Sequence, residues 1–507
     1  MREEKRLAEA GKIASVVLGA AGILCLLILF YFLYHYAWAR DRHFTSPFSP
    51  LLYYAFPAVL AGLCFASLRL RSSHRVNLAL LLVSVGFWVY AVEVMTTIWF
   101  SLPSVIAEAH VEERVRAARE RGIDFDTRSV FDVSNDLRKK GVDAYPIFYP
   151  DAALKKQPGY GHALLPLGGM SKKLSVLCNE SGEYVTYESD ERGFHNPNGF
   201  WSNGRFEIVA LGDSYVQGFC VPPEKNFVAW IRKSRPDTLN LGVASMGPLF
   251  MLGAMKEYAQ PVEPKVVLWF YYEGNDLRDL TVEMKNPLLM RYMEGGFSQD
   301  LLNRKAGIDQ AVADMLEKAK KRRRWNRVNE IWEAVRQPSS LAKKGRSILT
   351  LSQLLGSLGL IAGENRSLSS HIRSAEPDKR AQSVEYQAEI DLFGKILSHA
   401  NEVVNTWGGK LYFVYLPGWH RYARPEYAEK NRDRVLLLAE SIGLRTIDLH
   451  TAFQAQKDPL ALFPFRLHNH YNEAGHRLVA EEVLRSISLP PRASSAQPAW
   501  QESKVNG

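Results

Sequence analysis

Residues 207–218 read Glu-Ile-Val-Ala-Leu-Gly-Asp-Ser-Tyr-Val-Gln-Gly, and this stretch decides the fold. Its first five residues form a short apolar run, typical of a strand that is buried on both faces of a parallel sheet. A glycine turn follows and places Ser214 at the start of a helix, at the carboxyl end of the strand. Ligand crevices of open α/β sheets lie at that edge. Ser214 is therefore a candidate nucleophile, with helix capping as its alternative role.

Further apolar runs of the same kind follow, separated by helical segments. They are residues 238–243, 265–272, 410–416 and 444–449. This alternation predicts an α/β domain with a parallel sheet, which we place at residues 205–489. Residues 281–385 are too many for an ordinary connection between strands, so we expect a helical insertion there.

The apolar residues are concentrated in the first hundred positions. The stretches 13–36, 51–68 and 76–100 are each close to the roughly 20 residues that a helix needs to cross a bilayer. We therefore predict an anchor of three transmembrane helices over residues 1–104. Glu93 lies toward one end of the third stretch, which favours a carboxylate that reaches the membrane interface.

Basic residues near these stretches predict the orientation of the anchor. Four Lys and Arg precede the first stretch and three lie in the second loop, against two in the first loop. Cytoplasmic flanks carry the excess of basic residues, so the N-terminus is expected in the cytoplasm. Three crossings then place everything after about residue 102 outside the cytoplasm.

Residues 105–204 connect the anchor to the main domain. The first part, to about residue 140, is charged and predicts a solvated stalk helix, and the remainder is a lead-in segment. Cys178 and Cys220 both fall in the exported part, where a disulfide between them is permitted. The tail, residues 490–507, has a composition typical of disorder.

The formal net charge of +9 comes without any nucleic-acid-binding motif. We attribute it to flanks that face the membrane and to an anionic envelope, and we expect no nucleic-acid partner. The His and Cys residues lack the paired spacings of zinc or iron sites, and no nucleotide signature is present. Neither a metal nor a cofactor is therefore expected.

Polar residues and turns follow the second and third strands. The turn from Gly242 to Gly247 offers backbone N–H groups to a developing oxyanion, and Asn275 can donate its side-chain amide to the same atom. Asp213 and Asp276, beside Ser214 and Asn275, are expected to support them.

Three histidines lie close together near the C-terminus, in residues 467–477. One of them is expected to accept the Ser214 proton and return it to the leaving group. His468 and His476 are expected to be structural neighbours at the start of a helix, with His468 the nearer of the two to the site.

The order Gly-Asp-Ser, Gly, Gly-Asn-Asp and His-Tyr-Asn-x-x-Gly resembles the SGNH (GDSL-type) hydrolase superfamily over residues 205–488. The resemblance implies a flavodoxin-like three-layer α/β/α sandwich with serine esterase activity. The lead-in, with Cys178-Asn-Glu-Ser-Gly and Arg192-Gly-Phe-His-Asn-Pro, is similar to that of membrane-tethered bacterial members. It implies a bacterial inner-membrane protein with a periplasmic catalytic domain.

Residue by residue, the resemblance implies Ser214 as nucleophile and first oxyanion donor, and Asn275 as a second donor. It implies His470 as the base, because His470 stands before Tyr-Asn-x-x-Gly. The oxyanion glycine of the family aligns near Ser245, and a backbone donor needs no particular side chain.

The chain departs from the family pattern at the triad acid. The family places an Asp two or three residues before the histidine, where this chain has His468 and Leu467. A distant carboxylate or a backbone carbonyl can orient the histidine instead. Asp448, at the end of the fifth strand, is the substitute candidate, and a cap or turn role is its alternative.

These features predict an esterase that removes or transfers O-acyl groups, acetyl above all, on an envelope or secreted polysaccharide. A lipase or lysophospholipase acting at the membrane surface is the alternative within enzymes. The missing acid motivates a third hypothesis, a noncatalytic SGNH-fold protein that binds glycan or acts as a scaffold.

Overall fold

The computed structural model describes residues 2–34, 51–100, 102–154, 164–323, 331–332, 348, 351, 354, 386–424 and 430–489. The chain divides into two compact units, described separately below. The helical unit comprises residues 1–122 with 319–379, and the sheet unit comprises residues 123–318 with 380–507. The tail predicted to be disordered and most of residues 324–385 lie outside the described residues.

The helical unit contains two described helices that are long and apolar enough to cross a membrane, over Lys5–Phe32 and Ser72–Trp99. They belong to α1 (Arg2–Phe32) and α3 (Ser72–Trp99). The middle stretch forms the π-helical turn η2 (Leu51–Ala55) and α2 (Phe56–Ser67), which together are shorter. Two of the three predicted membrane helices thus have the length and composition that a span requires, and the middle one is shorter.

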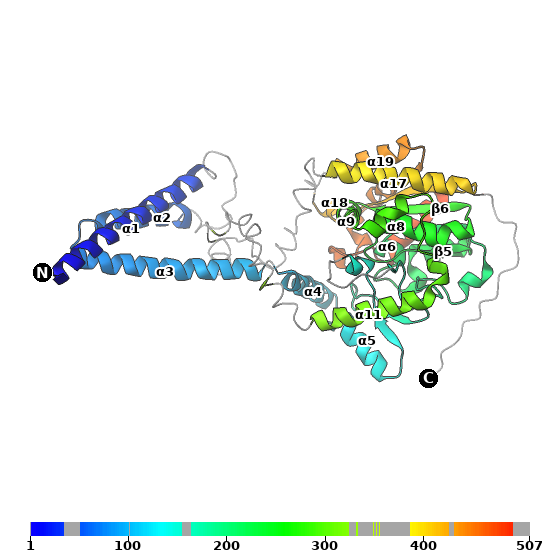
Figure 1. Cartoon of the computed structure of the whole chain (residues 1–507), viewed down its shortest axis with the longest axis horizontal. Coiled ribbons are helices and arrows are strands. Elements are labelled where there is room, and N and C mark those ends of the chain that lie inside the picture. Colours follow the sequence, from blue (N-terminus) through cyan, green and yellow to red (C-terminus); the bar gives the residue numbers. More distant parts are fainter. Residues whose placement is uncertain are drawn as a thin grey trace. The chain divides into compact units, whose positions relative to one another are not determined.

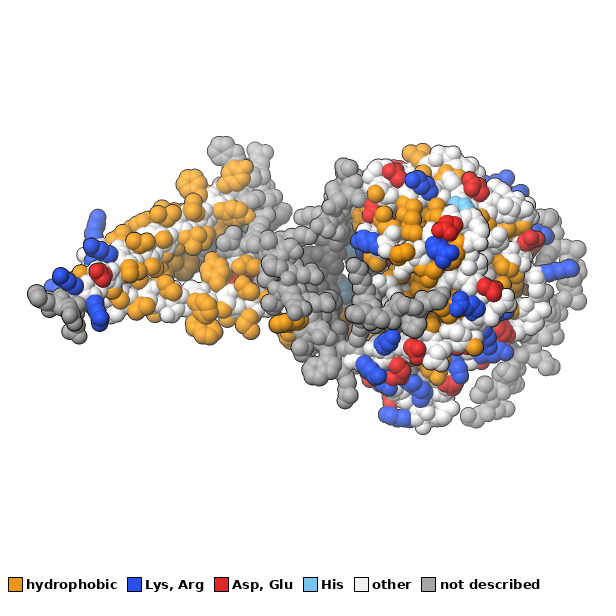
Figure 2. Space-filling view, in the orientation of Figure 1, with side chains coloured by type: hydrophobic (Ala, Val, Ile, Leu, Met, Phe, Trp, Pro, Cys, Tyr) orange, Lys and Arg blue, Asp and Glu red, His pale blue; other side chains and the backbone are white. Residues whose placement is uncertain are grey.

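Apolar side chains cover the outward surfaces of α1 and α3. Val16, Phe30, Trp88 and Met95 are each two thirds exposed or more, and Figure 2 shows the hydrophobic atoms spread over these helices. Inside the unit, small residues such as Ala14 and Ala79 let the helices pack closely. So large an exposed apolar surface marks an interaction site for lipid or protein.

Glu93 does not reach toward solvent within the helical unit. Its side chain is fully buried, and its carboxylate accepts a hydrogen bond from the backbone N–H of Leu354 at 2.7 Å. A partner from residues 319–379 thus satisfies this buried carboxylate, and the interfacial position stays a prediction.

The sheet unit is built on a five-stranded parallel sheet in the order β5-β4-β6-β7-β8. The strands are β4 (Ile208–Leu211), β5 (Thr238–Asn240), β6 (Val266–Tyr272), β7 (Lys410–Leu416) and β8 (Arg445–Asp448). All five predicted strands are present, and β7 has the predicted bounds. In chain order the arrangement is 2-1-3-4-5, as in doubly wound sheets.

Helices cover both faces of this sheet (Figure 1). Along β6, Trp269 packs into one buried cluster and Leu268 into the other, because successive side chains of a strand point to opposite faces. The first cluster includes residues of α8 (Pro248–Ala254), α17 (Gln387–Thr406) and α19 (Lys430–Ser441). The second includes residues of α7 (Phe227–Ser234), α20 (Leu449–Gln454) and α21 (Glu473–Ser486).

The predicted stalk is not one helix. It consists of α4 (Pro103–Arg119), in the helical unit, and α5 (Val130–Lys139), in the sheet unit. Gly122 has a φ of +68°, which ends the first helical segment, and Ser129 begins the second with a capping box. Val133 of α5 is buried against the lead-in.

The lead-in segment forms a small three-stranded sheet of its own. Its strands are β1 (Ala144–Pro146), β2 (Leu174–Val176) and β3 (Thr186–Glu188), in the order β1-β2-β3. The β1–β2 pair is parallel and the β2–β3 pair antiparallel. The compact sheet unit, which begins at residue 123, therefore includes this lead-in as well as the domain predicted from residue 205.

The first part of the predicted insertion is integral to the main core. It begins within α9 (Asp276–Glu283) and contains α10 (Pro287–Met290) and α11 (Lys305–Arg323). Ile308 and Val312 of α11 are buried in the same cluster as Trp269. The buried carboxylate of Glu257 also accepts backbone N–H groups of Gln299 and Leu301, which fixes this segment to the core.

Candidate active site

Ser214 begins α6 (Ser214–Gln217) directly after β4, as predicted. The preceding residue, Asp213, supplies the helix cap, because its carboxylate accepts the backbone N–H of Tyr215 at 2.9 Å. Ser214 therefore does not serve as the cap, and its hydroxyl is left for another partner. A side chain at Gly212 would collide with Val216, so the tight turn requires glycine there.

His470 is the partner of that hydroxyl. Its Nε2 lies 2.9 Å from Ser214 Oγ, although the two residues are 256 positions apart in the chain. The rings of Tyr215 and Phe219 lie 4.8 and 4.9 Å from the imidazole and confine it. The structure thus brings together the predicted nucleophile and base at the distance that proton transfer requires.

The carboxylate that orients His470 belongs to Glu180, which the sequence analysis did not single out. Glu180 Oε1 lies 2.9 Å from His470 Nδ1, and Oε2 accepts the backbone N–H of His470 at 2.8 Å. Glu180 is 5% exposed, so little water competes for these contacts. A carboxylate on Nδ1 favours the tautomer whose Nε2 accepts the Ser214 proton.

Asp448 does not perform this role. Its carboxylate forms an ion pair with Arg432 and caps α20, accepting the backbone N–H of His450 at 3.1 Å. The prediction of Asp448 as substitute acid is therefore wrong, and its alternative role as a cap is what the structure contains.

Glu180 is carried by a short hairpin of the lead-in. The backbones of Leu177 and Cys178 pair with Val185, and the Asn179 side chain accepts the N–H of Gly182 across the tip. Cys178 forms a disulfide with Cys220, so the predicted pairing is confirmed. The pairing of these cysteines is the sequence signal that points to Glu180, because Cys178 stands two residues before Glu180 and Cys220 stands six residues after Ser214.

Of the three backbone donors that the sequence suggested in the turn after β5, two have acceptors elsewhere in the protein. The Gly242 N–H donates to Asn240 and the Gly247 N–H to Glu283, which removes both from the predicted oxyanion donors. Ser245 has a φ of +64°, the left-handed conformation that favours glycine. Within the described residues no acceptor is recorded for its N–H.

Asn275 lies at the same edge of the sheet, after β6. Its Nδ2 lies 3.4 Å from Asp213 Oδ2, so the nucleophile turn and the third strand end are in contact. One amide hydrogen serves this contact, and the second is available to an oxyanion. Asp213 therefore supports the site twice, by capping α6 and by holding Asn275.

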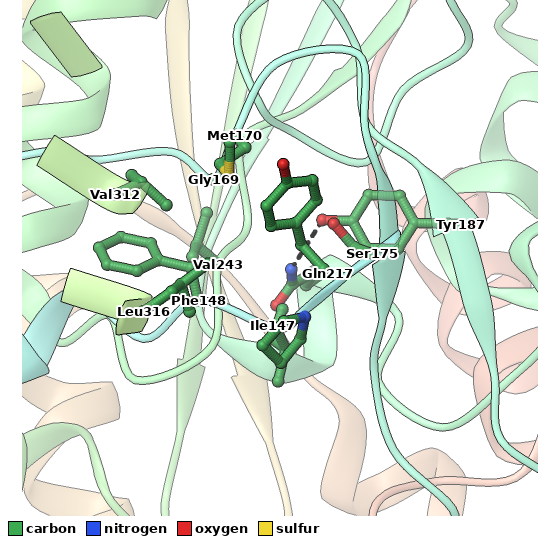
Figure 3. A pocket seen from close by; sticks show the side chains of 12 residues that line it. Ile147, Phe148, Gly169, Met170, Ser175, Tyr187, Gln217, Val243, Val312 and Leu316 are labelled. Carbon is green, nitrogen blue, oxygen red and sulfur yellow. Dashed lines mark hydrogen bonds between the residues drawn. The ribbon is translucent and has the colours of Figure 1, made fainter. Parts of the chain in front are cut away.

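Gln217 connects the turn after β5 to the lead-in. Its Oε1 accepts the backbone N–H of Ala244 at 2.8 Å, and its Nε2 donates to Tyr187 OH at 3.1 Å. Figure 3 shows Gln217 and Tyr187 joined in this way beside a cavity whose lining includes Val243. The cavity volume of about 10 Å³ suits a single water molecule.

The carboxyl group of Glu283, a buried residue of α9, contacts the turn after β5. Glu283 accepts the N–H groups of Gly247 and Leu249, and burial raises its pKa to about 8. Burial likewise raises the pKa of Asp279 to about 7 and that of Asp276 well above its ordinary value. Asp276, predicted as a supporting residue, accepts the backbone N–H of Tyr272 at 3.2 Å.

The other histidines have different neighbours. The ring of His468 lies 4.3 Å from that of His420 and 5.6 Å from that of Trp419. His476 is completely buried in α21, where it accepts the backbone N–H of Phe227, and burial lowers its pKa to about 3. Their role as structural neighbours at the helix start stays a prediction.

In the part of the chain that the structure describes, one trio of side chains has the spacing of metal ligands. Possible ligand atoms of Glu180, Cys220 and His470 lie within 4.8 Å of one another. They do not fit a metal, because the Cys220 sulfur is bonded to Cys178 and His470 Nδ1 is engaged by Glu180.

No protein-family model matches the chain, and no curated protein matches it either. The arguments for its function therefore rest on the geometry of the site and on the motifs.

Proposed function

We propose that this protein is a membrane-anchored serine esterase of the SGNH type, with Ser214, His470 and Glu180 as its catalytic triad. The observation that carries the proposal is the unbroken chain of contacts from Ser214 Oγ to His470 Nε2, and from His470 Nδ1 to Glu180. Nucleophile, base and acid come from three separate segments that converge at the carboxyl edge of a parallel sheet.

The reaction proceeds through an acyl-serine. Ser214 Oγ attacks the ester carbonyl while its proton passes to His470 Nε2, and Glu180 stabilises the resulting imidazolium. The negative charge on the carbonyl oxygen is met by the backbone N–H groups of Ser214 and Ser245 and by the Asn275 amide. His470 then protonates the leaving alcohol. Water, or an acceptor alcohol in a transferase, releases the acyl group by the reverse sequence.

Glu180 bears on the choice between an enzyme and a noncatalytic scaffold. The scaffold hypothesis was motivated by the missing acid, and Glu180 has the position of such an acid, with both oxygens on His470. A pure binding protein has no physical need for a nucleophile, a base, an acid and oxyanion donors in one place. This supports the enzyme.

For the substrate, we propose O-acyl groups, acetyl above all, on an envelope or secreted polysaccharide. The two apolar helices support an anchor in the inner membrane of a bacterium, with α2 as a third, shorter span. The basic flanks then put the sheet unit outside the cytoplasm, and the disulfide suits that oxidising side. Lipid esters at the membrane surface are the alternative substrate.

The test is hydrolysis of p-nitrophenyl acetate by the full-length chain in detergent, beside its Ser214→Ala and His470→Ala variants. We expect turnover that both substitutions abolish. Acetylated polysaccharide and lysophospholipid, offered to the same three proteins, separate the two substrate classes. A folded wild type with no turnover above the Ser214→Ala background on any of these esters would overturn the proposal.

A further inference from the structure

The disulfide joins the two parts of the sheet unit that carry the acid and the nucleophile. Cys178 is two residues before Glu180, and Cys220 follows the helix that starts at Ser214. The hairpin around Glu180 is also held by hydrogen bonds: Asn179 accepts the Gly182 N–H across the tip and donates to the backbone carbonyl of Asp126. The disulfide adds a covalent link from this hairpin to the segment that follows Ser214.

Holding the Glu180 side chain in place also has a cost in conformational entropy. Ordering a loop such as this hairpin loses conformational entropy. Phe219 and Leu177 pack in one small cluster at its base, and at its tip Glu180 accepts the backbone N–H of His470. A covalent bond two residues from Glu180 restricts the carboxylate to the neighbourhood of the imidazole before any substrate arrives.

We propose that the Cys178–Cys220 disulfide positions Glu180 for catalysis, so that the esterase is fully active only after this bond has formed. Cys178 and Cys220 are thus positioning residues that act through Glu180, and the inference rests on the proposed function. Reduction by a dithiol converts the disulfide to two protein thiols and the reductant to its own disulfide. Cys178 is partly exposed, which gives a reductant access.

The experiment compares four full-length proteins: the wild type, Glu180→Gln, the Cys178→Ala/Cys220→Ala double variant and that double variant with Glu180→Gln. Each is assayed with p-nitrophenyl acetate, oxidised and after dithiothreitol. A Cys25→Ala/Cys64→Ala double variant is the matched control, because these are the free cysteines. Thermal melts and near-ultraviolet circular dichroism establish that every sample is folded at the assay temperature.

We expect loss of the disulfide to lower kcat of the wild type by about 10- to 100-fold, with KM nearly unchanged, and reoxidation to restore it. In the Glu180→Gln background the same loss should change kcat less than about twofold, because the disulfide acts through Glu180. An equal fall in both backgrounds would overturn the proposal. So would unchanged activity on reduction, or a loss that follows unfolding.

A second readout does not depend on turnover. Diethyl pyrocarbonate modifies accessible imidazoles, and mass spectrometry gives the rate at His470. We expect reduction to raise this rate to that of Glu180→Gln, since the ring then loses a partner. If the oxidised wild type fails to turn over any ester but this rate still rises, the proposed function falls and the positioning by the disulfide stands. An unchanged rate overturns the positioning.

Discussion

Replacing Glu180 with Gln tests the triad most directly, because the change keeps the size of the side chain. His470 presents two hydrogens to Glu180, one on its backbone nitrogen and one on Nδ1. A carboxylate accepts both, but an amide has only one accepting oxygen. If the amide nitrogen faces Nδ1, the imidazole takes the tautomer whose Nε2 carries the proton, and it can no longer act as base toward Ser214.

The expected loss follows from this change of tautomer. An Asp-to-Asn change in the corresponding place of a serine protease lowers kcat by about 10⁴. We expect about 10³ to 10⁴ for Glu180→Gln, or roughly 4 to 5.5 kcal/mol of transition-state stabilisation, at about 1.36 kcal/mol for each factor of ten. KM should change little, because Glu180 lies behind the histidine and does not touch the substrate.

The assay is steady-state hydrolysis of p-nitrophenyl acetate over a range of pH, with Asp448→Asn as the matched control. Asp448 is also a carboxylate at the carboxyl edge of the sheet, but it pairs with Arg432. Its substitution should leave kcat within a few-fold of the wild type. A Glu180→Gln enzyme within tenfold of the wild type, or an Asp448→Asn enzyme that loses as much, would refute the assignment of the acid.

Three further predictions concern the surroundings of the triad. Asn275→Ala should lower kcat by about 10²- to 10³-fold with KM nearly unchanged, as measured in the same assay, because one oxyanion donor is lost. Gln217→Met should lower the free energy of unfolding by about 1–3 kcal/mol in urea melts, because the buried Ala244 N–H loses its acceptor. For Glu283, the folded-state pKa of about 8 exceeds the ordinary 4.5, so the folded protein binds the proton more tightly. Its stabilising contribution is complete below pH 4.5 and is lost as the pH rises through 8. Glu283→Gln should therefore flatten the fall of stability in that window, and a profile parallel to that of the wild type would contradict the burial of this carboxyl.

The sequence predicts the sheet and the Ser–His pair because both follow from local patterns. Apolar runs buried on both faces give all five strands, and parallel strands bring their carboxyl ends to one edge. Ser214 and Asn275 stand just after such strand ends, and His470 stands just before the start of α21. Their proximity in space therefore follows from the topology.

The acid could not be found in this way, because Glu180 lies outside the doubly wound domain. Its position depends on the folding of the lead-in onto the Ser214 segment, which no periodicity in the sequence reveals. The disulfide was the one long-range constraint available, and two cysteines leave a single pairing. Ser245 is a related case: its left-handed φ is set by the turn around it, not by its own preference.

The wide spacing of the triad along the chain has a consequence for the synthesis of the protein. Ser214 leaves the ribosome 256 residues ahead of His470, an interval of roughly 13 to 51 seconds at about 5–20 residues per second. Under the proposed function, the nascent chain holds a nucleophile without its base throughout that interval. We therefore expect esters near the emerging polypeptide to escape hydrolysis, and we expect a protease that removes the chain from His470 onward to return a finished molecule to the same inactive state.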